Sequence, residues 1–187
     1  MFEIAYWEMF TVLTAAMLAV SLIWLAKTKE GFCSREIRLI LFYICIVVIF
    51  RFVYFPLHHV DGKIAPLCFD SSKILPIWMN LVPFTFLTDR YDGWVINVVG
   101  NIFMFVPVGI VWPVCFKKLD TYGKAVLAGG GFSLFIELTQ LFFYDRSSDI
   151  DDLILNTAGA AIGVAIYFLV KRAAKKKAVP TGTDLQS

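Results

Sequence analysis

Five polar side chains within otherwise apolar stretches have the types and spacing to support chemistry: Asn97, Asn101, Glu137, Gln140 and Asn156. Asn97 and Asn101 are four residues apart and Glu137 and Gln140 three, so each pair shares one helical face. Polar groups are costly in hydrocarbon, so both pairs are expected to point into a helix bundle. For the amides, a hydrogen-bond network that only fixes packing is an open alternative. A carboxyl group within a span costs roughly 2.5 kcal/mol or more, which favours a functional role for Glu137.

A second polar group lies in the segment RSSDIDD, residues 146–152. Its acids directly precede the last apolar stretch, and one interpretation is that they cap a helix there. In the other, Asp149, Asp152 and Asn156 form one helical stripe that meets Glu137 and Gln140. The predicted functional cluster comprises Asn97, Asn101, Glu137, Gln140, Arg146, Asp149, Asp152 and Asn156.

Two chemistries suit this cluster. Its carboxylates and amide carbonyls could hold a hard divalent cation, or Arg146 and the amides could hold a phosphate or carboxylate headgroup. No known ligand spacing specifies a metal, and His58 and His59 lack a His-Glu-x-x-His pattern, so we predict neither a metal site nor a cofactor. The sequence also lacks a phosphate-binding glycine loop, a nucleophile elbow and a dinucleotide fingerprint, which argues against a soluble-type enzyme.

The elements that must position these residues are membrane helices. Of the 187 residues, 59% are hydrophobic and only 17% charged, and the mean hydropathy is +0.73, whereas soluble domains carry about 25% charged residues. Apolar runs near residues 5–26, 37–55, 95–116, 125–144 and 153–170 are of roughly spanning length. The sequence therefore predicts an all-α, polytopic membrane bundle of about five transmembrane helices.

Charge placement predicts the orientation of these helices. Lysine and arginine gather at residues 27–38, 117–124 and 171–177, whereas aspartates gather at residues 61–92 and 145–152. By the positive-inside tendency the N-terminus is outside and the C-terminus inside. We divide the chain into two N-terminal helices (1–55), an extracytoplasmic connection, interfacial or re-entrant (56–93), a three-helix core (94–170) and a disordered basic cytoplasmic tail (171–187).

Glycines in the last two spans are expected to serve packing. Gly129 to Gly131 and the pair Gly159 and Gly163 remove side chains and let neighbouring helices approach closely.

Four sequence blocks occur in an order that resembles the VanZ-like family. They are Asn80-Leu-Val-Pro83-Phe84, NVVGNIFMFVPVG (97–109), Glu137-x-x-Gln140 and RSSDIDDLILNTAGAAIG (146–163). The resemblance covers roughly residues 78–170, and the first two helices carry no motif. The family is named for a membrane protein associated with teicoplanin resistance. The resemblance thus implies a multi-pass protein of the bacterial plasma membrane that lowers susceptibility to teicoplanin-class glycopeptides.

Three functional hypotheses remain open. In the first, the polar cluster at the outer face binds a lipid-linked envelope precursor or the glycopeptide complex. The second is a membrane-embedded enzyme that modifies a lipid-linked cell-envelope precursor, with Glu137 or Asp152 as general base and a divalent ion assisting. The third is a role in packing or assembly alone. The expected partners include membrane lipids and exclude nucleic acid, and the sequence does not indicate an oligomeric state.

Overall fold

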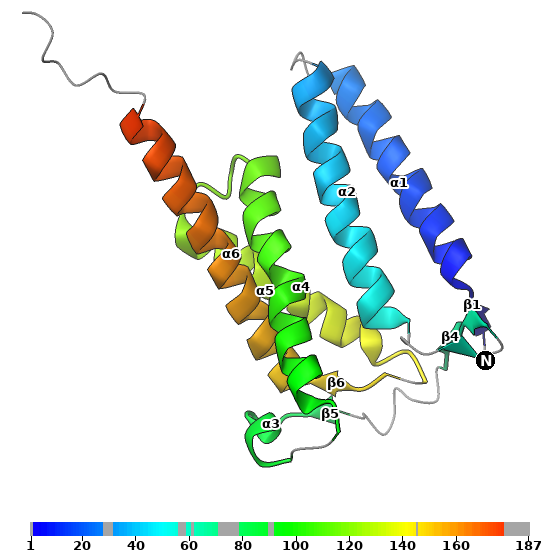
Figure 1. The fold of residues 1–187 in the computed structure, drawn as a ribbon. Coiled ribbons are helices and arrows are strands. Elements are labelled where there is room, and N and C mark those ends of the chain that lie inside the picture. Colours follow the sequence, from blue (N-terminus) through cyan, green and yellow to red (C-terminus); the bar gives the residue numbers. More distant parts are fainter. Residues whose placement is uncertain are drawn as a thin grey trace, which may run out of the picture.

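The chain is an all-α membrane bundle with short strands before the first helix and in the connections (Figure 1). The computed structural model describes residues 2–27, 32–55, 59–60, 62–70, 79–89, 92–144 and 146–177. The helices in this part are α1 (Tyr6–Lys27), α2 (Phe32–Tyr54), α3 (Thr85–Thr88), α4 (Trp94–Cys115), α5 (Tyr122–Gln140) and α6 (Ile150–Lys177). Its strands are β1 (Phe2–Ile4), β2 (His59–Val60), β3 (Lys63–Ile64), β4 (Leu67–Phe69), β5 (Met79–Asn80) and β6 (Ser148–Asp149).

Four of the helices are long and apolar enough to cross a membrane: α1, α2, α4 and α6. The predicted run 125–144 forms α5, but this helix ends at Gln140, earlier than expected. Three consecutive glycines and Glu137 dilute the apolar character of α5, which explains why it falls outside this group. The structure thus supports a membrane bundle, while five spans and the orientation stay predictions.

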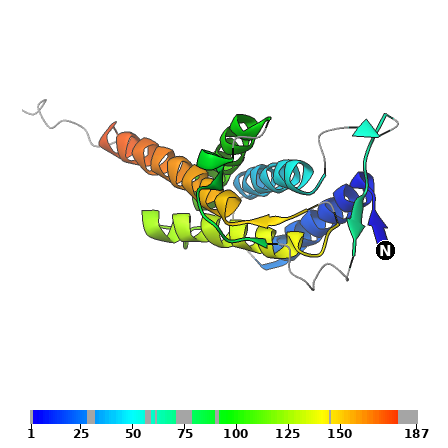
Figure 2. The same cartoon turned by 90° about the horizontal axis from the view of Figure 1, so that it is seen from below.

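The helices form two groups that α2 joins. Figures 1 and 2 show α1 beside α2 on one side and α4, α5 and α6 packed together on the other. The largest contact is between α4 and α6, and α2 packs against α4. The buried core joins α2, α4, α5 and α6 through Ile49, Val53, Tyr54, Phe55, Leu67, Phe105, Val108, Ile136 and Ala160.

Three glycines make the contact between α4 and α6 possible. A Cβ atom added to Gly109 would lie 2.1 Å from the carbonyl oxygen of Ala160. A Cβ added to Gly159 would lie 2.1 Å from the carbonyl oxygen of Ile102, and one added to Gly163 would lie 2.0 Å from the carbonyl oxygen of Val106. The predicted packing role is therefore confirmed for Gly159 and Gly163. The packing role is also confirmed for Gly129 and Gly130. An added Cβ would lie 2.6 Å from the Ala160 Cβ at Gly129 and 3.1 Å from the Thr157 hydroxyl oxygen at Gly130.

The packing prediction is wrong for Gly131, where a Cβ would meet nothing within 4 Å. The reason is that Gly131 is exposed and lies off the face of α5 that packs against α6.

Replacing Gly159 by alanine should therefore destabilise the bundle, whereas Gly131→Ala should not. The new methyl group at position 159 must displace the backbone of α4, and overpacking of this kind costs about 1–3 kcal/mol. Thermal unfolding of the purified protein in detergent measures the effect. Equal unfolding temperatures for the two variants would contradict the close helix contact.

The basic tail differs from its prediction. Helix α6 begins at Ile150 and continues to Lys177, so residues 171–177, expected to be disordered, are helical. Alanine, lysine and arginine favour helix, and lysines in the last turn complement the negative end of the helix dipole. Residues 178–187 lie outside the described part of the chain, as do Asp61, Asp145 and His58.

The described part of the connection between α2 and α4 contains β2 to β5 and the short helix α3, and β2 pairs antiparallel with β3. Strand β1 pairs antiparallel with β4, and β5 pairs parallel with β6. The second pairing brings Asn80 beside Asp149, at the end of the bundle where α4 and α6 begin (Figure 1). Whether this connection re-enters the membrane stays a prediction.

Candidate functional site

A cavity of about 210 Å³, here called the polar cavity, lies where α5 ends and α4 and α6 begin. Residues from α2, α4, α5, α6 and the segment before β6 surround it. They are Phe52, Val53, Asn97, Asn101, Met104, Ile136, Glu137, Gln140, Arg146, Ser147, Asp152 and Asn156. This set includes every residue of the predicted cluster except Asp149.

Asn101 and Asp152 join α4 to α6 at the wall of the polar cavity. The Asn101 Nδ2 donates to Asp152 Oδ1 at 2.5 Å and to Asn97 Oδ1 at 3.3 Å. Asn97 and Asn101 thus share one helical face, as their spacing predicts. Asn101 is buried, whereas Asn97 is exposed.

Glu137 connects α5 to the start of α6. Its side chain is only 4% exposed, and its Oε2 accepts a hydrogen bond from the Asp149 backbone N–H at 2.8 Å. A buried carboxylate requires such donors, because a buried charge without hydrogen-bond partners is costly. Glu137 therefore positions a polypeptide segment and also presents a carboxyl group to the cavity.

Two buried amides leave acceptor atoms without a partner. Gln140 Nε2 donates to the Val53 carbonyl at 3.3 Å, and Asn156 Nδ2 donates to Ser133 Oγ at 3.0 Å. Within the described residues, Gln140 Oε1 and Asn156 Oδ1 accept no hydrogen bond. An unsatisfied buried acceptor costs about 1–3 kcal/mol, so a ligand that donates O–H or N–H groups would gain stability here.

Arg146 contributes positive charge to the cavity wall and links it to α2. Its Nε and Nη2 both donate to the Tyr54 carbonyl, at 3.1 and 2.9 Å. Tyr54 is the last residue of α2, where carbonyl groups lack intrahelical partners. Helix α2, which carries no recognised motif, therefore supplies part of the site.

Asp149 lies outside the cavity lining and caps α6. Its Oδ1 accepts from the Asp151 N–H at 2.8 Å, and its Oδ2 accepts from Asn80 Nδ2 at 3.1 Å. The capping interpretation thus describes Asp149. In the predicted stripe, only Asp152 and Asn156 line the cavity together with Glu137 and Gln140.

Asp151 is the important residue that sequence reasoning left out of the cluster. Its carboxylate accepts hydrogen bonds from the Phe84 N–H at 2.5 Å, the Thr85 hydroxyl at 2.6 Å and the Phe86 N–H at 3.3 Å. It therefore anchors the segment that begins with the Asn80 to Phe84 block. The sequence did carry a signal for Asp151, because capping one helix does not require all three acids, Asp149, Asp151 and Asp152.

A larger apolar groove of about 690 Å³ adjoins the polar cavity between α2 and α4. The two share Phe52, Asn97, Asn101 and Met104. The rest of the groove is lined by Ile44, Cys45, Val48, Gly93, Ile96, Gly100, Phe103 and Pro107. A polar compartment thus lies beside an apolar one that is lined by two candidate spans.

Comparisons with known proteins agree with the sequence blocks. The model of the VanZ/LLP1 family matches residues 40–171. Protein VanZ of Enterococcus faecium is 30% identical over 99 residues, which are 53% of this chain. The alignment covers 58% of VanZ, less than two thirds of its length. No solved structure matches the chain. The family match begins within α2, earlier than the 78–170 extent of the motifs, in keeping with the contribution of α2 to the cavity. This chain is a member of the VanZ/LLP1 family.

Proposed function

We propose that this protein is a multi-pass protein of the bacterial plasma membrane that lowers susceptibility to teicoplanin-class glycopeptides. It does so by holding the polar end of a lipid-linked envelope component in the polar cavity. The observation that carries the proposal is that this cavity and the apolar groove share four lining residues. An amphipathic ligand matches both compartments, its head beside Glu137 and Arg146 and its tail between α2 and α4.

The dimensions favour a lipid-linked component over the drug as the direct ligand. A volume of about 210 Å³ corresponds to roughly seven water molecules at ~30 Å³ each. One sugar ring or a phosphate group occupies such a space, whereas a glycopeptide antibiotic is far larger. The groove, at about 690 Å³, is within the usual range of ligand pockets and suits a hydrocarbon chain.

The hydrogen-bonding groups favour a head rich in donors. The acceptors without partners, Gln140 Oε1 and Asn156 Oδ1, and the carboxylates of Glu137 and Asp152 all suit hydroxyl or amide groups of a sugar or peptide. Arg146 adds a positive charge that favours phosphate.

A substitution that fills part of the apolar groove tests whether the lipid tail binds there. At Gly100 a Cβ meets nothing within 4 Å, so Gly100→Leu projects into the groove without displacing the backbone. We expect at least about tenfold weaker binding of a fluorescent polyprenyl-diphosphate cell-wall precursor to the purified protein, since the tail loses several buried CH₂ groups at ~0.8 kcal/mol each. Gly131→Leu, also in open space but outside the groove, should bind like the wild type. Equal affinities in the two variants would reject a tail in the groove.

Drug susceptibility tests the resistance part of the proposal. Expression in a glycopeptide-sensitive host should raise the inhibitory concentration of teicoplanin relative to an empty vector, with vancomycin measured beside it. No difference from the empty vector would overturn this part and leave the lipid-binding part to the Gly100 experiment.

The enzyme alternative has one observation in its favour, because the carboxyl groups of Glu137 and Asp152 line the same cavity. Either could act as general base on a bound precursor. Incubating the purified protein with labelled precursor, with and without a metal chelator, separates the two functions. Turnover supports the enzyme, and stoichiometric retention without turnover supports the binding protein.

A further inference from the structure

The polar cavity combines two carboxylates with two amide oxygens that lack a hydrogen-bond partner. Glu137 and Gln140 are three residues apart on α5, and Asp152 and Asn156 are four apart on α6, so each pair shares one helical face. All four residues line the polar cavity. Glu137, Gln140 and Asn156 are only 4%, 7% and 2% exposed. The structure thus brings four oxygen-bearing side chains from two packed helices to one buried site.

The nitrogen atom of each amide is already bonded to the protein. Gln140 Nε2 donates to the Val53 carbonyl, and Asn156 Nδ2 donates to Ser133 Oγ. Among the described residues, the atoms left without a partner are the two amide oxygens, Gln140 Oε1 and Asn156 Oδ1. Turning either amide over would break the bond that its nitrogen makes. The amides therefore offer the cavity acceptors and no donors.

Hydrogen bonds orient both carboxylates and leave them able to bind a cation. Glu137 Oε2 accepts from the Asp149 N–H at 2.8 Å, and Asp152 Oδ1 accepts from Asn101 Nδ2 at 2.5 Å. A carboxylate has two oxygens with about four lone-pair sites, so one such bond does not exhaust it. Carboxylates that bind metal ions are commonly held by hydrogen bonds of this kind.

The charges of the lining favour a cation over a neutral donor group. The charged residues that line the polar cavity are Glu137, Asp152 and Arg146, two acids and one base. A sugar hydroxyl satisfies an acceptor but leaves the excess negative charge in place. A phosphate group adds to that charge, because two carboxylates repel it at short range. A divalent cation offsets the carboxylate charge and also attracts phosphate.

The kind of donors indicates which cation fits. Carboxylate and amide oxygens suit hard cations such as Mg²⁺, and neither histidine nor cysteine lines the polar cavity. Mg²⁺ usually binds through one or two carboxylates, waters and the phosphates of a substrate rather than in a cage built by protein alone. In the described part of the chain, no group of three or more His, Cys, Asp and Glu side chains could hold a metal ion. An open site that a phosphate completes agrees with this arrangement.

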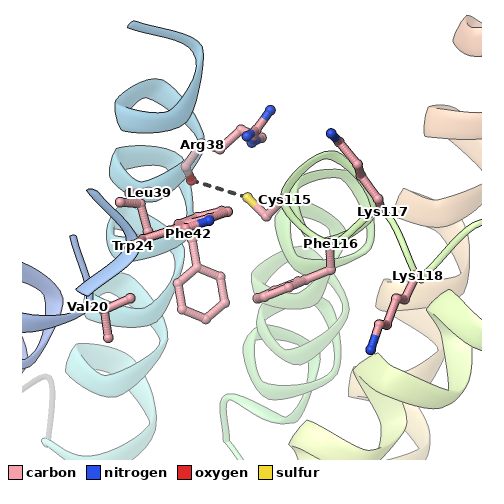
Figure 3. A pocket seen from close by; sticks show the side chains of 9 residues that line it. All are labelled: Val20, Trp24, Arg38, Leu39, Phe42, Cys115, Phe116, Lys117 and Lys118. Atoms are coloured by element: carbon pink, nitrogen blue, oxygen red, sulfur yellow. Dashed lines mark hydrogen bonds between the residues drawn. The ribbon is translucent and has the colours of Figure 1, made fainter. Parts of the chain in front are cut away.

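Two other pockets lack this set of donors. A pocket of about 530 Å³ lies between α1, α2 and the end of α4, and its charged lining residues are Arg38, Lys117 and Lys118 (Figure 3). The apolar groove has no charged lining residue. Neither pocket offers a carboxylate, so neither competes with the polar cavity for a divalent cation.

We propose that the polar cavity binds a divalent cation of the Mg²⁺ type through the two carboxylates and the two amide oxygens that line it. The cation and Arg146 together hold a phosphate group of the lipid-linked component. This role in phosphate binding rests on the function proposed above, whereas binding of the ion itself does not. Residue spacing did not specify the site, because its ligands come from two helices and meet only where α5 packs against α6.

Binding of Mn²⁺ to the purified, chelator-treated full chain tests this site. Mn²⁺ prefers the same oxygen ligands as Mg²⁺, and the electron paramagnetic resonance signal of the free ion weakens when the ion binds. The wild type should bind one Mn²⁺ per chain, and excess Mg²⁺ should release it. Asp152→Asn keeps an oxygen that can accept from Asn101 but loses the charge. This variant should bind Mn²⁺ at least about tenfold more weakly.

Asp92→Asn is the matched control. Asp92 is exposed, lies just before α4 begins and does not line the polar cavity. Because solvent and salt screen an exposed charge, this variant should keep the affinity for Mn²⁺ within about twofold. An unchanged signal of free Mn²⁺ with the wild type, or equal affinities in Asp152→Asn and Asp92→Asn, would overturn the proposal.

Asn156→Asp gives a second test that does not depend on how well Asp152→Asn folds. A carboxylate in place of the amide should bind Mn²⁺ about tenfold more tightly, since the number of charged ligands tunes the affinity for such ions. An amide that serves packing alone predicts lower stability and no gain in binding. Unchanged or weaker Mn²⁺ binding by Asn156→Asp would contradict the site.

The fluorescent polyprenyl-diphosphate precursor separates this inference from the proposed function. A chelator should weaken precursor binding to the wild type, and added Mg²⁺ should restore it. Mn²⁺ binding without any precursor binding would support the cation site and reject the lipid ligand. Precursor binding that the chelator leaves unchanged, in a protein that binds no Mn²⁺, would reject the cation site and support the lipid ligand.

Discussion

Replacing Glu137 by glutamine is expected to abolish protection against teicoplanin without lowering the amount of protein in the membrane. The glutamine oxygen can still accept the Asp149 N–H, so the segment before α6 keeps its anchor. The negative charge that faces the polar cavity is lost, and hydrogen bonds to charged groups contribute about 1.5–3 kcal/mol. Binding of the precursor should weaken by about 10- to 100-fold.

The measurement compares inhibitory concentrations of teicoplanin with membrane abundance on immunoblots. Glu8→Gln is the matched control, because Glu8 also accepts a backbone hydrogen bond, from the Ala5 N–H at 2.9 Å, but lies away from the cavity. Full protection by Glu137→Gln would reject the site. Loss of protection together with loss of protein would instead support a role in packing alone.

Replacing Asp151 by alanine should release the segment around residues 84–86 from the bundle. Three donors, the N–H groups of Phe84 and Phe86 and the Thr85 hydroxyl, lose their shared carboxylate. Phe84 has a left-handed backbone with φ of 65°, which is unfavourable for a non-glycine residue, so this turn depends on its hydrogen bonds. A cost of about 3 kcal/mol or more is expected.

Limited proteolysis and thermal unfolding of the purified protein measure this effect. Asp151→Ala should be cleaved faster within residues 79–89 and should unfold at a lower temperature. Asp120→Ala is the control, since Asp120 is exposed and pairs only on the surface with Lys124, at 2.7 Å, and such pairs contribute less than about 1 kcal/mol. The same cleavage rate in both variants would show that Asp151 does not hold this segment.

Helix packing was predictable where one chemical rule governs it. Small residues four apart predict a close helix contact, and Gly159 and Gly163 make one with α4. The same reasoning failed for Gly131, because glycine content does not reveal which face of a helix meets a neighbour. The role of Asp149 was equally open in the sequence, because a carboxylate at the start of a helix can either cap that helix or line a cavity. Only the path of the chain in the structure shows that Asp149 is a cap.

By itself the sequence determined that this is a membrane protein, roughly where its helices lie, and which polar residues belong to the candidate site. It could do so because the length of an apolar run and the helical periodicity are local properties. Only the tertiary structure decided how these residues meet. It placed Arg146 on the carbonyl of Tyr54, 92 positions away, and Asp151 on the turn at Phe84. It also placed the polar cavity beside the apolar groove, with four lining residues in common. Such contacts depend on which helix faces pack together, and the spacing within one helix does not specify its neighbour.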